Sequence, residues 1–110
     1  MLLALGTKLL VCHRRLFADD HPRFFAGVVE AYESGIAKIT GFTWSRDPAR
    51  GFQRRAEART KLVAIASGTL MVYELPAEVN LEKLRIEQPN VHAVLLTDGV
   101  SFQMDLAERL

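Results

Sequence analysis

The chain has 110 residues, of which 49% are hydrophobic and 25% are charged, and its formal net charge is +1. This length fits a single domain, residues 1–110, with a modest core, and the composition is that of an ordinary globular protein. The small net charge excludes a strongly basic, histone-like binder of nucleic acid.

The charge is nevertheless divided along the chain. Up to Tyr73 there are 11 basic and 6 acidic residues, whereas from Glu74 onward there are 3 basic and 7 acidic residues. This division favours one basic and one acidic surface, suited to self-association or to the attraction of an anion. Solvated faces with no binding role explain it equally well.

Cysteine usage and the first residues bear on location. Cys12 is the only cysteine, so an intramolecular disulfide is excluded and a reducing compartment is compatible. The apolar residues 1–5 are far short of the roughly 20 needed to span a bilayer, and no basic segment precedes them. We therefore expect no signal peptide, no membrane partner and a cytoplasmic location.

Short segments rich in β-branched and aromatic residues, separated by Gly, Pro, Asn or Asp, indicate a mainly β domain. Residues 8–17 fit a first strand or a helix leading into one, and residues 18–22 fit a turn. A strand over 23–32 and its return over 36–44 form a hairpin, because Gly35 supplies the positive φ that a tight turn needs.

The second half continues this pattern. Residues 45–58 are polar and predict a long loop, and strands over 60–66 and 69–75 flank a turn at Ser67-Gly68. After Pro76 the sequence predicts a short helical turn at 80–84, capped by Asn80, and then a terminal hairpin. Its strands, 91–97 and 100–106, flank Asp98-Gly99, the best hairpin signal in the chain.

Two glycine-containing motifs carry a resemblance to a known family. The first has Gly27, Val29, Tyr32, Glu33 and Ile36, and the second has Gly68, Met71, Val72, Tyr73 and Pro76. In this order and spacing they resemble the two motifs of the Sm-like (LSm) small β-barrels. The chain departs from the family at Ala37, where an RNA-contacting Asn is usual, and at Ser67, where an Arg is usual.

The resemblance implies a fold and an assembly. The expected fold is an SH3-like or Sm-like five-stranded bent-sheet barrel over about residues 8–76, with residues 77–110 as an extension that holds the helical turn and hairpin. In the family, the fourth strand of one subunit pairs with the fifth strand of the next, which closes a homo-oligomeric ring. The corresponding edge residues here are Leu62, Val63, Ile65, Leu70, Val72 and Tyr73. The alternative is a monomer whose C-terminal hairpin covers one edge.

The resemblance also implies RNA as a partner. The family pocket maps to Ile36, Ala37, Ser67 and Gly68, which offer neither an aromatic ring, an amide nor a charge. We therefore expect weak RNA binding, or binding through another surface. The best other surface is the basic segment that contains Arg54 and Arg55, with Trp44 nearby, although an Arg-rich loop is often simply solvated.

Catalytic and metal-binding patterns are weak. Cys12 and His13 are adjacent, so on a strand they point to opposite faces, and no spaced pair of further ligands completes a metal site. Neither Ser34 nor Ser67 stands in a strand-to-helix nucleophile elbow. The sequence therefore predicts a non-enzymatic protein with no cofactor. It is either a ring-forming RNA-binding protein or a homo-oligomeric scaffold that binds no nucleic acid.

Overall fold

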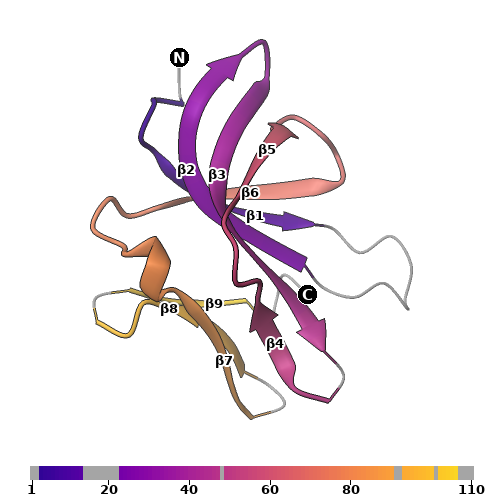
Figure 1. Ribbon diagram of the computed structural model, residues 1–110, viewed down its shortest axis with the longest axis vertical. Helices are drawn as coiled ribbons and strands as arrows, with labels where there is room; N and C mark the ends of the chain where they lie inside the picture. The colour runs from indigo at the N-terminus through magenta and orange to yellow at the C-terminus, as the bar shows by residue number, and fades with distance from the viewer. Residues whose placement is uncertain (1–2, 14–22, 48, 91–92, 101, 107–110) are drawn as a thin grey trace.

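The computed structural model describes residues 3–13, 23–47, 49–90, 93–100 and 102–106, and these form two antiparallel sheets (Figure 1). The larger sheet contains β1 (Lys8–His13), β2 (Arg23–Glu33), β3 (Ile36–Asp47), β4 (Gly51–Arg54), β5 (Arg59–Ala64) and β6 (Leu70–Leu75). The smaller sheet contains β7 (Arg85–Asn90), β8 (Ala93–Thr97) and β9 (Gln103–Asp105), and a 3-10 turn, η1 (Leu81–Lys83), precedes it. The mainly β class expected from the sequence is confirmed.

The larger sheet has the strand order β4-β3-β2-β1-β6, and β5 also pairs with β3. Strands β4 and β5 lie one after the other along the same side of β3, since β4 pairs with residues 44–47 and β5 with residues 36–41. Within the described part of the chain, β5 pairs only with β3 and β6 pairs only with β1. The sheet is therefore open there, with β5 and β6 at opposite edges.

The local structure differs from the expectations at three places. Residues 45–58 do not form one long loop, because β3 continues to Asp47 and β4 returns from Gly51, whose φ of +76° suits the end of the turn. Residues 59–64 and 70–75 are strands that flank the expected turn, where the Leu70 N–H donates to the Ser67 carbonyl oxygen at 3.2 Å, but the two strands do not pair with each other. The expected terminal hairpin is confirmed by the antiparallel pairing of β8 with β9, but the extension also holds a third strand that was not expected.

The additional strand is β7, to which the sequence analysis assigned no structure and which contains Pro89. A proline inside a strand removes a ladder hydrogen bond, and its presence argued against a strand here. The pairing of β7 with β8 is irregular between Glu87 and Asn90, which is where this proline sits. The expected cap is confirmed, since the Asn80 side chain accepts a hydrogen bond from the Glu82 backbone N–H at 3.0 Å.

Two facing glycines allow the long strands β2 and β3 to bend across the middle of the molecule (Figure 1). Gly27 and Gly41 are direct partners in the register. A Cβ on Gly41 would lie 1.9 Å from the carbonyl oxygen of Ala26, and one on Gly27 would lie 2.5 Å from that of Thr40. No residue other than glycine fits this approach, and a register shift between Val29 and Ala31 adds a bulge to the same pair.

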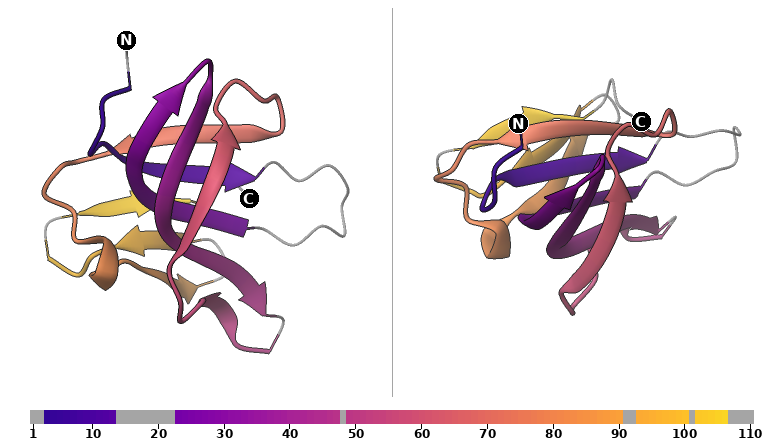
Figure 2. Two further views of the ribbon diagram at one scale, coloured as in Figure 1. Left: turned by 45° about the horizontal axis from the view of Figure 1, so that its top comes forward. Right: turned by 90° about the horizontal axis from the view of Figure 1, so that it is seen from above.

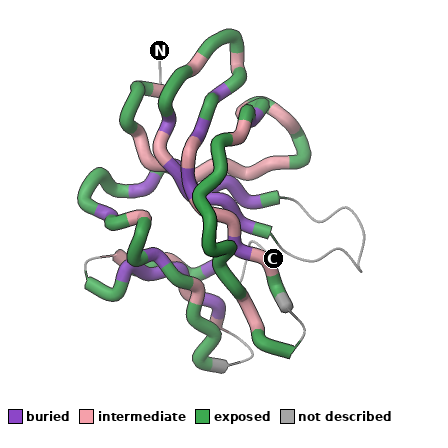
Figure 3. Tube along the Cα trace, viewed as in Figure 1, coloured by how far each residue is buried: buried purple, intermediate pink, exposed green. Residues whose placement is uncertain are grey.

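The bent sheet is buried on both faces. Along β1, Leu10 and Cys12 belong to a core shared with the small sheet, whereas Leu9 and Val11 belong to a second core on the opposite face. The small sheet packs along one side of the larger sheet (Figure 2) and pairs with neither of its edges. The extension therefore covers a face of the larger sheet and leaves the edge strand β5 largely exposed (Figure 3).

Polar contacts also hold the extension to the larger sheet. The Lys8 ammonium donates hydrogen bonds of 2.6 Å each to the carbonyl oxygens of Ala77 and Val79. The Arg54 guanidinium donates one of 2.6 Å to the carbonyl oxygen of Glu82. Because these acceptors lie in the segment that leads into the small sheet, they fix where the extension begins to fold back.

The substitution Gly41→Ala should lower the free energy of unfolding by about 3 kcal/mol or more, because the methyl group would overlap the β2 backbone. Gly68→Ala is the matched control, since a Cβ there meets no atom within 4 Å, and it should change stability by less than about 0.5 kcal/mol. Urea denaturation followed by circular dichroism measures both. Equal stabilities would show that the close approach does not constrain the fold.

Candidate nucleic-acid interface

Five basic side chains and two hydroxyls surround a pocket of about 360 Å³ at one end of the larger sheet. They come from β1, β2, β3, β5 and the residue that follows β4. We call this the cationic pocket, and its lining residues are His13, Arg23, Thr43, Ser45, Arg55, Arg59 and Lys61.

Strand alternation explains why these residues meet. His13 lies two residues beyond Val11 on β1, and Lys61 lies two residues before Val63 on β5, so each continues the face of a buried apolar neighbour. Arg23 pairs with Ser45 in the register of β2 and β3. The cationic pocket is therefore the polar end of the inner face whose middle is the second core.

The positively charged side chains around the pocket repel one another. Burial lowers the pKa of His13 below its ordinary value, and the nearby cations Arg23 and Lys61 lower it further. Burial likewise lowers the pKa of Lys61, and Arg23, Arg59 and Arg55 add to the effect. No carboxylate of the described residues lines the pocket, so an anion would relieve this repulsion.

The chemistry of the pocket suits phosphate. Guanidinium groups such as those of Arg55 and Arg59 form paired hydrogen bonds with phosphate oxygens, and the hydroxyls of Thr43 and Ser45 can donate further ones. Within the described ranges, no three His, Cys, Asp or Glu side chains come together in a way that could hold a metal ion. Anion binding by side chains is thus the chemistry that this site offers.

The two adjacent arginines predicted as contacts lie on different sides of the sheet. Arg55 lines the cationic pocket. Arg54 instead lies 4.5 Å from the centre of the Phe42 ring and bonds the Glu82 carbonyl, so its contacts are within the protein. The same alternation buries Trp44, which is 1% exposed, in the core beneath the small sheet.

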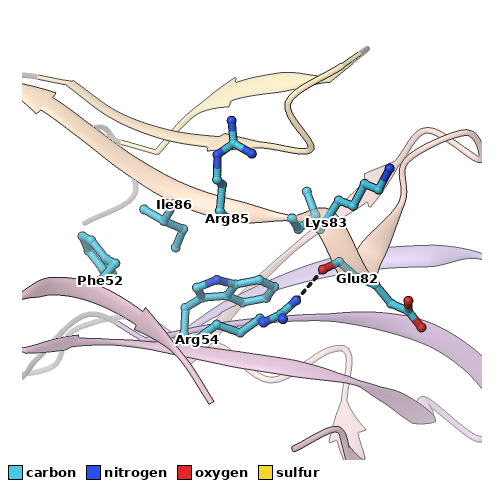
Figure 4. Close-up of a pocket in the computed structure, with 8 residues that line it drawn as sticks. Phe52, Arg54, Glu82, Lys83, Arg85 and Ile86 are labelled. Atoms are coloured by element: carbon cyan, nitrogen blue, oxygen red, sulfur yellow. Dashed lines mark hydrogen bonds between the residues drawn. The ribbon is translucent and has the colours of Figure 1, made fainter. Parts of the chain in front are cut away.

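Arg54 and Trp44 belong to a second hollow, a cleft of about 300 Å³ between β4 and the start of the small sheet. Phe52 and Ile86 enter it from opposite sheets, and the Arg54–Glu82 hydrogen bond crosses it (Figure 4). Its full lining is Trp44, Phe52, Arg54, Glu82, Lys83, Leu84, Arg85 and Ile86. This cleft is where the two sheets begin to separate.

The positions that match the family's RNA pocket lie outside the cationic pocket, although Ser67 lines an adjoining pocket that shares His13 and Lys61 with it. The two turns that carry them approach each other, since the Ile65 N–H donates to the carbonyl oxygen of Gly35 at 3.0 Å. Ile36 and Gly68 are exposed and Ser67 is half-buried, but Ala37 is fully buried and offers no side-chain surface. None of these four lines the cationic pocket, and their role in binding stays a prediction.

Sequence reasoning did not place His13, Arg23, Thr43 or Ser45 in a common site. Arg59 and Lys61 follow Arg54 and Arg55 in the same basic segment, but the residues that line the pocket with them come from strands distant in sequence. The available signal was period-two alternation, since polar residues at 43 and 45 continue the inner-facing positions of β3. That signal predicts a face, and only the pairing of strands brings the faces together.

Comparison with known protein families, with curated proteins and with solved structures finds no match for this chain. In the part of the chain that the structure describes, no helix is long and apolar enough to cross a membrane.

Pyrophosphate bound in the cationic pocket should raise the pKa of His13, because an anion favours the charged imidazolium that burial and the neighbouring cations disfavour. By linkage, pyrophosphate binding should tighten as the pH falls from about 7 to 6.

Without the anion, the lowered pKa of His13 makes the folded protein less stable as the pH drops below about 6.5, because the His13 imidazole then binds the proton more tightly in the unfolded chain than in the folded one.

An NMR titration of the His13 imidazole with and without pyrophosphate measures this shift. The Arg55→Gln variant serves as the comparison and should show a smaller rise, since it removes one of the anion's partners. An unchanged His13 pKa at saturating pyrophosphate would contradict an anion site beside this residue.

Proposed function

We propose that this protein binds single-stranded RNA, weakly and through the cationic pocket instead of the usual family surface, as an Sm-like ring-forming protein. The observation that carries the RNA proposal is the gathering of five basic side chains around one pocket that no described carboxylate lines. Phosphate contacts supply most of the affinity of weak, sequence-tolerant nucleic-acid binding. Part of the unfavourable repulsion between these cations is then relieved when the strand binds.

The strand arrangement supports the Sm-like part of the proposal. In this proposal β1, β2, β3, β5 and β6 correspond to the family's five strands, and β4 is an insertion between the third and the fourth. Both have an edge without a partner among the described residues, and Leu62 on β5 is 74% exposed. Such edges favour pairing with another copy of the chain.

The alternative function is a homo-oligomeric scaffold that binds no nucleic acid. The same exposed edges support it, because they can join copies of the chain whether or not an anion occupies the pocket. The two functions differ in one observable, which is salt-sensitive binding of RNA by the assembled protein.

The substitution Arg55→Glu should weaken binding of a short U-rich RNA about tenfold or more, and it should reduce the dependence of log affinity on log salt by about 0.7 per lost phosphate contact. Arg50→Glu makes the same charge change at an exposed turn residue that lines neither of the two pockets described above, and it should have a much smaller effect. Fluorescence polarisation at two salt concentrations measures both. Equal effects of the two substitutions would contradict a role for the pocket.

The substitution Leu62→Glu should convert the assembled protein to a monomer, because it places a charge on the edge of β5 that is proposed to pair with a neighbour. Val100→Glu is the control, since Val100 is 85% exposed in the loop that follows β8. Multi-angle light scattering, with and without RNA, measures the mass. A wild-type protein that is monomeric in both conditions would contradict the ring.

A further inference from the structure

We propose that Lys61 is a covalent attachment site for aldehydes that carry a phosphate, with the phosphate held in the cationic pocket and the carbonyl carbon at the Lys61 amine. The proposal rests on the anion-binding role given above to that pocket. It adds the chemical class of ligand that can be held covalently and names the atom that reacts.

Lys61 lies where two pockets meet. Besides the cationic pocket, it lines an apolar pocket of about 220 Å³ between β5 and β6, and His13 is the other residue common to both. Val11, Val63 and Leu70 contribute apolar walls to the second pocket. A ligand with an anionic end and a less polar body can therefore occupy both pockets with Lys61 between its two ends.

The surroundings of Lys61 favour its uncharged, nucleophilic form. Three arginines, Arg23, Arg59 and Arg55, act on it with like charge, and they outweigh the opposite effect of the Phe25 ring, whose centre lies 4.8 Å from the ammonium nitrogen. Burial and these charges lower the pKa of Lys61, so more of the amine is free at neutral pH than in an exposed lysine. Desolvation and a neighbouring cation are the two devices that activate lysines for Schiff-base formation.

The reaction needs no co-reactant. The lone pair of the Lys61 nitrogen attacks the carbonyl carbon, a C=N bond forms, and the two hydrogens of the neutral amine leave with the carbonyl oxygen as water. His13 lines both pockets, and an imidazole can accept or donate a proton near neutral pH, so His13 can relay a proton during this step. The phosphate takes no part in bond making and serves to raise the local concentration of the aldehyde.

The other lysines provide controls within the same chain. The four lysines are Lys8, Lys38, Lys61 and Lys83. The Lys8 ammonium donates to two carbonyl oxygens, and the side chains of Lys38 and Lys83 are exposed. None of these three lines the cationic pocket, so a reagent that depends on that pocket should distinguish Lys61 from them.

The experiment treats the full chain with pyridoxal 5′-phosphate or with pyridoxal, reduces the products with borohydride, and maps the modified lysines and the N-terminal amine by peptide mass spectrometry. We expect pyridoxal 5′-phosphate to modify Lys61 about tenfold faster than Lys38 or Lys83, whereas pyridoxal should show no such preference. Pyrophosphate and the Arg55→Gln substitution should each slow modification of Lys61 alone. Equal labelling by the two reagents, or preferred labelling of another lysine, would overturn the proposal.

Two further arms separate this inference from the RNA-binding function. A short U-rich RNA should protect Lys61 from pyridoxal 5′-phosphate; selective labelling without such protection would keep the aldehyde site and count against RNA in this pocket. An abasic oligonucleotide, which carries an aldehyde between phosphates, should become crosslinked to wild-type protein by borohydride and fail to crosslink to K61Q. Labelling by pyridoxal 5′-phosphate without this crosslink would restrict the site to small phosphorylated aldehydes.

Discussion

The close approach of β2 and β3 at Gly27 and Gly41 is the constraint on which the rest of the structure depends. Because neither residue has a Cβ, the two backbones meet at a distance that any other side chain would prevent. The long strands can then bend, and one face of the sheet becomes an inner face with the second core in its middle. The opposite face is left for the small sheet to cover.

Because side chains alternate along a strand, basic residues of one segment lie on opposite faces of the larger sheet. Arg55, Arg59 and Lys61 meet at the end of the inner face, while Arg54 and Trp44 belong to the side covered by the extension. A basic segment that looks uniform in sequence thus contains residues that hold the protein together and residues that surround an open pocket. The crowding of like charge in that pocket is unfavourable in the free protein, and it is the feature that an anion would relieve.

The extension fixes which parts of the larger sheet remain available. It buries one face through residues such as Leu84, Val94 and Leu96, and the hydrogen bonds from Lys8 and Arg54 set its starting position. It pairs with neither β5 nor β6 in the described residues. The edges are consequently left for other partners, which is the physical basis of the proposed assembly.

The sequence alone predicts the mainly β class, the first hairpin around Gly35, the Asn80 cap and the basic character of the segment before β5, because these depend on local propensity and composition. It did not predict β7, since Pro89 argues against a strand until an irregular pairing accommodates it. The sequence also could not predict that His13 and Arg23 line the same pocket as Lys61, because their proximity depends on strand pairing across the sheet. Only the pairing of strands in the folded protein determines whether a basic residue lines the cationic pocket or lies on the side covered by the extension.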